Sequence, residues 1–131
     1  MKPTPVIAIF DVGKTNKKFF LFNEQYQIVL ERSAKFDETN DEDGFPCDDV
    51  QLLRQWVTMG IKEVMNLKQF SVKAINFSAY GASFVHIDSK GEPVAPLYNY
   101  LKPFPKKFHE QFYHQMFVLI FYWHLRHRLK E

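Results

Sequence analysis

Residues 7–22 read IAIFDVGKTNKKFFLF and place a polar loop between two apolar runs. The runs, Val6–Phe10 and Phe19–Phe22, are rich in β-branched and aromatic residues, which is typical of buried strands. The loop begins at Asp11, contains Gly13 and continues with hydroxyl, amide and lysine side chains. The sequence therefore predicts a strand, a polar loop and a second strand at the start of the chain.

The residues of this loop fit two interpretations. It is an ordinary hairpin turn, because D-x-G is a common turn pattern, or it binds a phosphate. In the second case Gly13 lets backbone N–H groups approach the phosphate oxygens. Thr15 and Asn16 would add short hydrogen-bonding side chains, and Lys18 a compact positive charge. Asp11, at the end of the strand, would hold Mg²⁺ through water, because this ion keeps much of its hydration shell.

The next segments predict a strand, a loop and a helix. Tyr26–Ala34 is expected to extend the hairpin into an antiparallel meander, and Asp37–Asp49 is acidic and polar, as in a solvated loop. From residue 50 to residue 67 apolar side chains recur at helical spacing. Either Asp48 or Asp49 can accept backbone N–H bonds at the start of this helix.

Two further strands are predicted after the helix. They are expected at Lys73–Ser78 and Ser83–Asp88, with a turn at Ser89–Gly91 that makes a small hairpin. The predicted order is therefore β-β-β-α-β followed by a hairpin, a mixed α/β fold in which a strand after a helix permits a parallel crossover.

Composition narrows the class of protein. A chain of 131 residues with 46% apolar residues predicts one folded unit. Because 17 basic and 15 acidic residues nearly balance, neither a nucleic acid nor a membrane is expected as a partner. Cys47 is the only cysteine, which excludes an internal disulfide, and Pro3 and Pro5 interrupt any signal-peptide pattern. We expect a cytoplasmic protein.

The loop also resembles a known phosphate motif. Asp11–Lys18, DVGKTNKK, followed by Leu21 and Phe22, is similar to the first phosphate motif of the FGGY carbohydrate kinases, D-[IV]-G-T-[ST]-x-x-K-x-x-L-F. Lys14 stands where that family usually has a threonine or serine. The Walker A pattern and the dinucleotide pattern G-x-G-x-x-G are both absent from the chain.

Two later segments resemble the same family in order and spacing. Ile75–Ala82 is similar to a strand and small-residue loop that faces the sugar, and Val85–Pro96 is similar to the hairpin V-x-L-D-x-x-G-x-P-L-x-P. After Pro96 the family continues W-x-D-x-R, of which Asn99 is the remaining polar match. The resemblance covers residues 6–113.

The resemblance implies a fold, an activity and a set of site residues. The implied fold is an incomplete ribonuclease H-like domain of the actin-like ATPase type, over residues 1–113, and the implied activity is phosphoryl transfer from Mg-ATP to a sugar or polyol hydroxyl. The implied nucleotide-binding residues are Asp11, Gly13, Lys14, Thr15, Asn16 and Lys18, with Asp11 also the magnesium residue. The implied sugar-binding residues are Tyr80, Gly81, Ala82 and Asn99. The family's catalytic base lies beyond the matched region, so no catalytic residue is expected here and the chain alone is expected to be inactive.

Residues 114–131 form a basic, aromatic tail that does not match the family. Either a frameshift or premature end in the gene produced this tail, or it is a surface helix that touches a membrane or a partner. Its apolar run, Met116–Trp123, is too short to span a bilayer. The alternative to a kinase fragment is a non-catalytic module that binds phosphate or sugar, or that self-associates through uncovered apolar surface.

Overall fold

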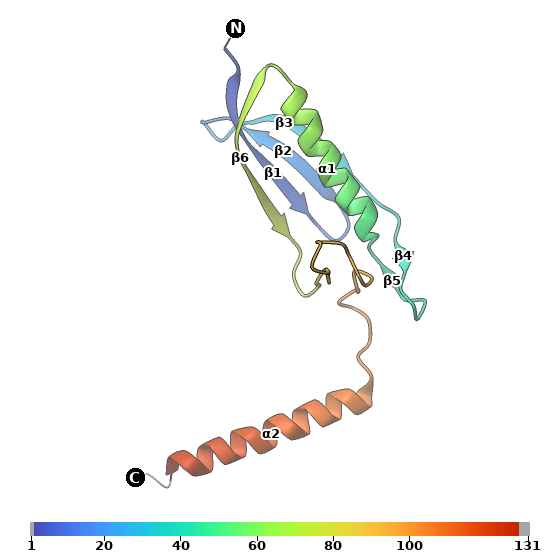
Figure 1. The fold of residues 1–131 in the computed structure, drawn as a ribbon. Helices are drawn as coiled ribbons and strands as arrows, with labels where there is room; N and C mark the ends of the chain where they lie inside the picture. Colours follow the sequence, from blue (N-terminus) through green and yellow to red (C-terminus); the bar gives the residue numbers. More distant parts are fainter. Residues whose placement is uncertain (1, 129–131) are drawn as a thin grey trace. The chain divides into compact units, whose positions relative to one another are not determined.

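The computed structural model describes residues 2–128 of the chain, and the side chains of residues 2–119. It divides into two compact units, residues 1–100 and residues 101–131. The first unit contains the sheet and one long helix, and the second contains a single helix (Figure 1). The candidate site residues all belong to the first unit.

A four-stranded sheet with the order β3-β2-β1-β6 forms the first unit. The strands β1, β2 and β3 are antiparallel neighbours, whereas β6 is parallel to β1 after a crossover through helix α1 (Figure 1). The bounds are β1 Thr4–Val12, β2 Lys17–Phe22, β3 Ile28–Ala34, α1 Val50–Asn66 and β6 Phe70–Ala79. The predicted order β-β-β-α-β is therefore confirmed.

The segment that was predicted to be a solvated loop contains a small additional ladder. Strands β4, Thr39–Asn40, and β5, Pro46–Cys47, pair antiparallel there. Asp41 closes the turn between them, because its carboxylate accepts hydrogen bonds from the backbone N–H groups of Asp43 and Phe45, both at 2.9 Å. This ladder brings the chain to the start of α1.

The prediction of a strand at Ser83–Asp88 is wrong. Only an isolated bridge between Ile87 and Pro93 forms in that region. The side chain of Asp88 accepts from the backbone N–H groups of Lys90 and Glu92, and Gly91 has a φ of +80°. These side-chain bonds close the predicted turn. Its two arms are joined by only two backbone bonds, from Asp88 N–H to the Glu92 carbonyl and from Val94 N–H to the His86 carbonyl, both 2.9 Å, so the predicted hairpin is present but too short to form strands.

The core lies between α1 and one face of the sheet. Because side chains alternate along a strand, every second residue of β1 points toward the helix. The buried cluster consists of Val6, Ala8, Phe10, Phe19, Leu21 and Val64. Phe10 is its centre, with ring centroids 4.5 Å from Phe19, 5.2 Å from Phe77 and 5.5 Å from Trp56. The helix passes so close that a Cβ on Gly60 would lie 3.1 Å from the Phe10 ring.

The opposite face of the sheet has no covering helix within this unit, in the part of the chain that the structure describes (Figure 1). Ile7 is exposed there, and Ile9, Phe20 and Phe22 are half-buried. Asp11 is exposed on the same face, since it alternates with the core residues of β1. The first candidate residue therefore lies on the open side of the sheet.

The second unit contains α2, Lys106–Arg128, which begins after Pro105. Large apolar side chains such as Phe108, Phe112 and Phe117 are exposed along it. The helix is continuous across residues 113 and 114. The boundary predicted there separates the part of the sequence that resembles the kinase family from the tail, and it stays a prediction. Among the described residues, no helix combines the length and the hydropathy that a membrane span requires.

Replacing Phe10 by alanine tests the position of the core. Because Phe10 is fully buried among three aromatic rings, Phe10→Ala should lower the free energy of unfolding by about 3 to 5 kcal/mol. Phe84→Ala, at an exposed phenylalanine of the same unit, is the control and should change it by less than about 0.5 kcal/mol. Urea titration followed by circular dichroism measures both, and equal effects would contradict this core.

Candidate functional site

The predicted phosphate loop is the four-residue connection between β1 and β2. The strands pair up to Val12 and Lys17, so residues 13–16 form the turn. A Cβ on Gly13 would lie 2.6 Å from the carbonyl oxygen of Asn16, closer than real side chains come. Glycine is therefore required at position 13 by the tightness of the hairpin itself, whether or not a phosphate binds.

Asp11 and Lys18 lie side by side next to this loop. They are directly opposite each other in the β1–β2 ladder, and Asp11 is also opposite Ser78 of β6. Lys18 reaches Glu31 at 3.4 Å, but both side chains are more than 40% exposed, so this ion pair is weak. The structure therefore brings the predicted magnesium residue and the predicted phosphate lysine together on the open face.

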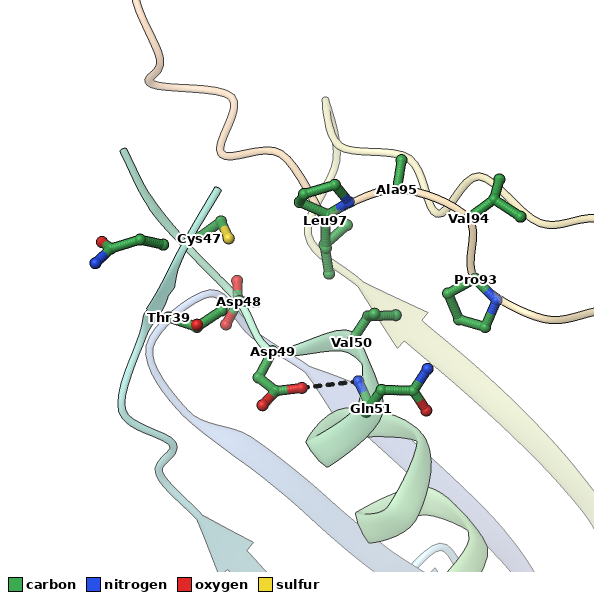
Figure 2. A pocket seen from close by; sticks show the side chains of 12 residues that line it. Thr39, Cys47, Asp48, Asp49, Val50, Gln51, Pro93, Val94, Ala95 and Leu97 are labelled. Atoms are coloured by element: carbon green, nitrogen blue, oxygen red, sulfur yellow. Dashed lines mark hydrogen bonds between the residues drawn. The ribbon is translucent and has the colours of Figure 1, made fainter. Parts of the chain in front are cut away.

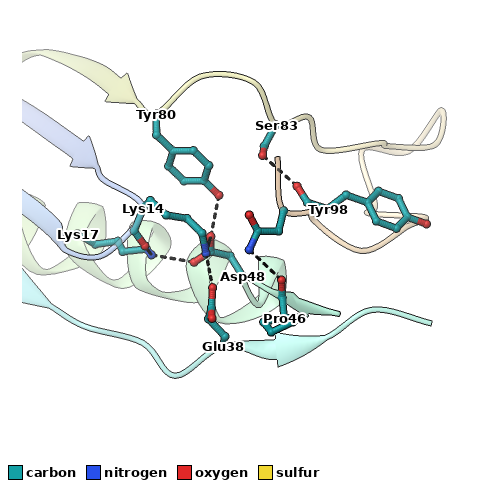
Figure 3. Close-up of polar contacts among 9 residues, drawn as sticks. Lys14, Lys17, Glu38, Pro46, Asp48, Tyr80, Ser83 and Tyr98 are labelled. Carbon is teal, nitrogen blue, oxygen red and sulfur yellow. Dashed lines mark hydrogen bonds and ion pairs between the residues drawn. The ribbon is translucent and has the colours of Figure 1, made fainter. Parts of the chain in front are cut away.

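Lys17 points in the opposite direction, into the side covered by α1. Its side chain is almost fully buried, and its ammonium donates to Asp48 Oδ1 at 2.9 Å (Figure 3). The same ammonium donates to the carbonyl oxygen of Lys14 at 2.9 Å. A buried lysine thus holds both the loop backbone and an aspartate from another segment.

Asp48 collects two further donors on its second oxygen. The ammonium of Lys14 lies 3.0 Å and the hydroxyl of Tyr80 2.7 Å from Asp48 Oδ2 (Figure 3). Lys14 also pairs with Glu38 at 2.5 Å. The lysine that departs from the family motif is therefore bonded to two carboxylates of the same chain, and the motif loop is joined to the end of β6.

Sequence reasoning missed this role of Asp48 and considered it only as a helix cap. The cap is its neighbour: the Asp49 carboxylate accepts from the backbone N–H groups of Gln51 and Leu52. The sequence did contain a signal for this role, namely two adjacent aspartates. A helix needs only one N-cap residue, so the second aspartate is available for another interaction. Asp48, only 7% exposed, is then available to the two lysines.

The charges in this cluster shift the proton equilibria of its members. Burial by itself raises the pKa of Asp48, but the hydrogen bonds from Lys17, Tyr80 and Lys14 outweigh it and hold the pKa below its ordinary value. Burial and the hydrogen bond to ionised Asp48 raise the pKa of the Tyr80 hydroxyl. Burial lowers the pKa of Lys14, but its bonds to Glu38 and Asp48 raise it more. At neutral pH Asp48 is therefore ionised, Lys14 carries its proton and the Tyr80 phenol is neutral.

The predicted sugar residues begin where β6 ends. Tyr80 bonds through its backbone N–H to the Val12 carbonyl at 3.1 Å, so this end of β6 adjoins the phosphate loop. Gly81 follows, and Ala82 has a φ of +63°, a backbone region that alanine rarely adopts. The amide of Asn99 donates to the Pro46 carbonyl at 3.0 Å, which anchors it to β5. These four positions stay predictions as sugar contacts.

A pocket of about 420 Å³ lies beside the cluster, at the start of α1 (Figure 2). Its walls come from β4, from the residues around the helix cap and from residues 93–97. Asp48 forms part of its wall, together with the polar side chains of Thr39, Asn40, Asp49 and Gln51. None of the predicted nucleotide-binding or sugar-binding residues lines this pocket, and no sequence signal indicated it.

Comparison with known proteins supports the resemblance. No model of a protein family matches the sequence. A curated rhamnulokinase of Mannheimia succiniciproducens is 26% identical over 98 residues, which are 72% of this chain and 20% of that enzyme. The chain resembles the N-terminal part of the FGGY carbohydrate kinases. It spans about a fifth of the length of the kinase that it matches.

Two solved sugar kinases share the fold. A gluconate kinase of Lactobacillus acidophilus superposes with a TM-score of 0.60 at 22% identity, over 71% of this chain and 19% of that one. A ligand-bound xylulose kinase of the same organism superposes with a TM-score of 0.59 at 22% identity, over 70% and 19%. The mixed sheet with its crossover helix therefore matches part of the actin-like ATPase fold of these FGGY-type kinases.

Removing the charge of Asp48 should destabilise the fold strongly. Asp48→Asn leaves the buried ammonium of Lys17 without a carboxylate, which should cost about 3 to 5 kcal/mol of unfolding free energy. Glu63→Gln breaks the exposed ion pair with Arg32 and should cost less than about 1 kcal/mol. Chemical denaturation at neutral pH measures both variants, and similar small losses would show that the buried pair contributes little.

The contribution of Asp48 should also depend on pH. Because its pKa is lowered in the folded state, its stabilisation is complete above the ordinary value of 3.8 and is lost as the pH falls through the lowered pKa. The difference in unfolding free energy between wild type and Asp48→Asn should therefore stay constant near neutrality and shrink below about pH 4. Urea titrations from pH 7 to pH 3 measure it; a difference that grows in acid would reverse the assigned sign.

Proposed function

We propose that this chain is the N-terminal part of an ATP-dependent carbohydrate kinase and that its β1–β2 loop holds the nucleotide phosphates. One observation supports this most directly: Asp11 and Lys18 lie together beside a glycine-dependent hairpin, in a fold shared with sugar kinases. The weak pairing of Lys18 leaves its ammonium able to exchange to a phosphate oxygen.

The residues fit a magnesium ion that accompanies the nucleotide. Mg²⁺ in nucleotide sites is held by one or two carboxylates together with phosphates and several waters. Asp11 supplies one exposed carboxylate next to the loop, and no cluster of three or more metal-ligating side chains occurs among the described residues. This set suits an ion bound mainly by phosphate and water, which would neutralise charge on the transferred group.

The sugar is proposed to bind next to the loop, at the end of β6. The carboxyl ends of the parallel strands β1 and β6 lie at the same edge of the sheet, where ligands of open α/β sheets bind. Tyr80, Gly81 and Ala82 follow β6 at this edge, and the Tyr80–Val12 backbone bond joins them to the loop. Phosphoryl donor and acceptor hydroxyl would thus approach each other from adjacent strand ends.

Catalysis by these 131 residues alone is not proposed. Transfer requires a carboxylate that accepts the proton of the sugar hydroxyl. Asp48 is unsuited to that role, because its oxygens already accept from Lys14, Lys17 and Tyr80 and its pKa is lowered. The proposed base and the rest of the nucleotide cleft belong to the further length of a complete kinase.

A second candidate is a non-catalytic module that self-associates. The observation that favours it is the uncovered face of the sheet, where Ile7 is exposed beside the half-buried Phe20 and Phe22. Sedimentation of the purified chain distinguishes this candidate, since a monomer at all concentrations would exclude it.

Nucleotide binding should appear as thermal stabilisation. A ligand that binds only the folded state adds about 2.7 kcal/mol at a hundredfold excess over its Kd, so Mg·ADP and Mg·ATP should raise the melting temperature. Asp11→Ala should abolish the rise, whereas Asp43→Ala, an exposed aspartate of the β4–β5 turn, should keep it. A cooperative melt that no nucleotide shifts would contradict nucleotide binding by this chain.

Turnover should require a longer chain. In a coupled assay of ATP consumption with rhamnulose, gluconate, xylulose and common polyols, the 131 residues should be inactive. A chimaeric protein that fuses residues 1–100 to the remaining part of the Mannheimia rhamnulokinase should show turnover with one of them. Turnover by the 131 residues alone would mean that a carboxylate of this chain acts as the base.

A further inference from the structure

We propose that Asp48 is the positioning residue of this site: through Lys14 and Lys17 it fixes the phosphate loop, and through Tyr80 it couples that loop to the segment after β6. This inference rests on the proposed function, because it names the residue that holds the proposed phosphate loop and the proposed sugar-binding segment together. It assigns to Asp48 no contact with nucleotide or sugar.

The geometry of the carboxylate supports this role. Lys17 donates to one oxygen at 2.9 Å, and Lys14 and Tyr80 donate to the other at 3.0 and 2.7 Å. The donors are 31 to 34 residues away in sequence and come from the β1–β2 hairpin and from the end of β6 (Figure 3). One buried side chain therefore connects the two segments that the proposed function requires to be adjacent.

The loop is held through its backbone as well as its side chains. Lys17 donates to Asp48 and also to the carbonyl oxygen of Lys14, so the bound ammonium restrains the turn from inside. A loop that is already held in one conformation binds a ligand without a further entropic cost for its ordering. Lys14, at a position usually occupied by a hydroxyl in the FGGY motif, completes the pairing with Asp48 and Glu38.

Only an ionised carboxylate suits this position. Two ammonium groups meet there, and the Lys17 side chain is almost completely buried, so a neutral partner would leave positive charge uncompensated. An asparagine has the same shape but turns one acceptor oxygen into an N–H donor, which faces the lysines or the tyrosine unfavourably. The substitution Asp48→Asn therefore removes the function of the residue with little change of volume.

The experiment is amide hydrogen exchange of the wild type, Asp48→Asn and Asp49→Asn. The control removes the same charge one residue away, and asparagine still caps the helix. In Asp48→Asn, exchange at the Tyr80 amide, which donates to the Val12 carbonyl, and in the β1–β2 ladder next to the loop should speed up about tenfold or more, beyond any change in the rest of β1. In Asp49→Asn, exchange in both segments should stay within about twofold of the wild type. Unchanged exchange in Asp48→Asn, or a uniform increase over the whole sheet, would overturn the proposal.

The double variant Asp48→Asn/Lys17→Met separates positioning from stability. It removes the unpaired buried ammonium and should recover most of the melting temperature that Asp48→Asn loses, which also provides a folded protein if the single variant does not fold. The two segments should stay loose, because Tyr80 and Lys14 still lack their carboxylate. Recovery of slow exchange together with stability would show that Asp48 has only a structural role and would overturn the proposal.

The same samples with Mg·ADP separate this inference from the proposed function. If Mg·ADP slows exchange of residues 13–16 in the wild type and not in the double variant, both stand. If Mg·ADP has no effect on the wild type while the variants still loosen both segments, the positioning by Asp48 stands and nucleotide binding falls. If Mg·ADP protects the loop equally in the wild type and the double variant, nucleotide binding stands and Asp48 is not its positioning residue.

Discussion

The buried ion pair between Lys17 and Asp48 is the constraint on which the arrangement of the site depends. A lysine ammonium that is removed from water needs a carboxylate at hydrogen-bonding distance, and here the carboxylate is brought by a segment 31 residues away. Because the same carboxylate also accepts from Lys14 and Tyr80, the hairpin, the start of α1 and the end of β6 meet at one point. Breaking the Lys17–Asp48 ion pair would therefore affect the hairpin, the start of α1 and the end of β6.

The two faces of the sheet have different roles. The face toward α1 contains the aromatic core around Phe10, and at its end the buried Lys17. The other face carries Asp11 and Lys18 and has half-buried or exposed apolar residues in place of a packed layer. Alternation along β1 and β2 thus separates a lysine that supports the loop from a lysine that can reach a ligand, although the two are adjacent in sequence.

The similarity to sugar kinases and the geometry of the loop point to different properties of this protein. Similarity to sugar kinases over about a fifth of their length, and the shared fold, support the family relationship. The positions of Asp11 and Lys18 beside a glycine-dependent turn support phosphate binding by this chain. Lys14 has a different environment, because it lies in the motif but is bonded to carboxylates of its own chain.

The hairpin, the long helix, the order of these elements along the chain and the residues of the loop can be predicted from the sequence, because strand and helix periodicity and turn-forming residues are local properties. The prediction of a strand at Ser83–Asp88 was wrong, because only two backbone bonds and one isolated bridge pair this segment with residues 92–94 around the turn that Asp88 closes. Long-range packing determines which face of the sheet the helix covers, and hence that Lys17 is buried whereas the Lys18 side chain is 43% exposed. The same packing determines that Asp49 caps the helix and that Asp48 binds two lysines and a tyrosine. These three partners of Asp48 are more than thirty residues away in sequence, and the tyrosine reaches it only because the crossover places β6 beside β1.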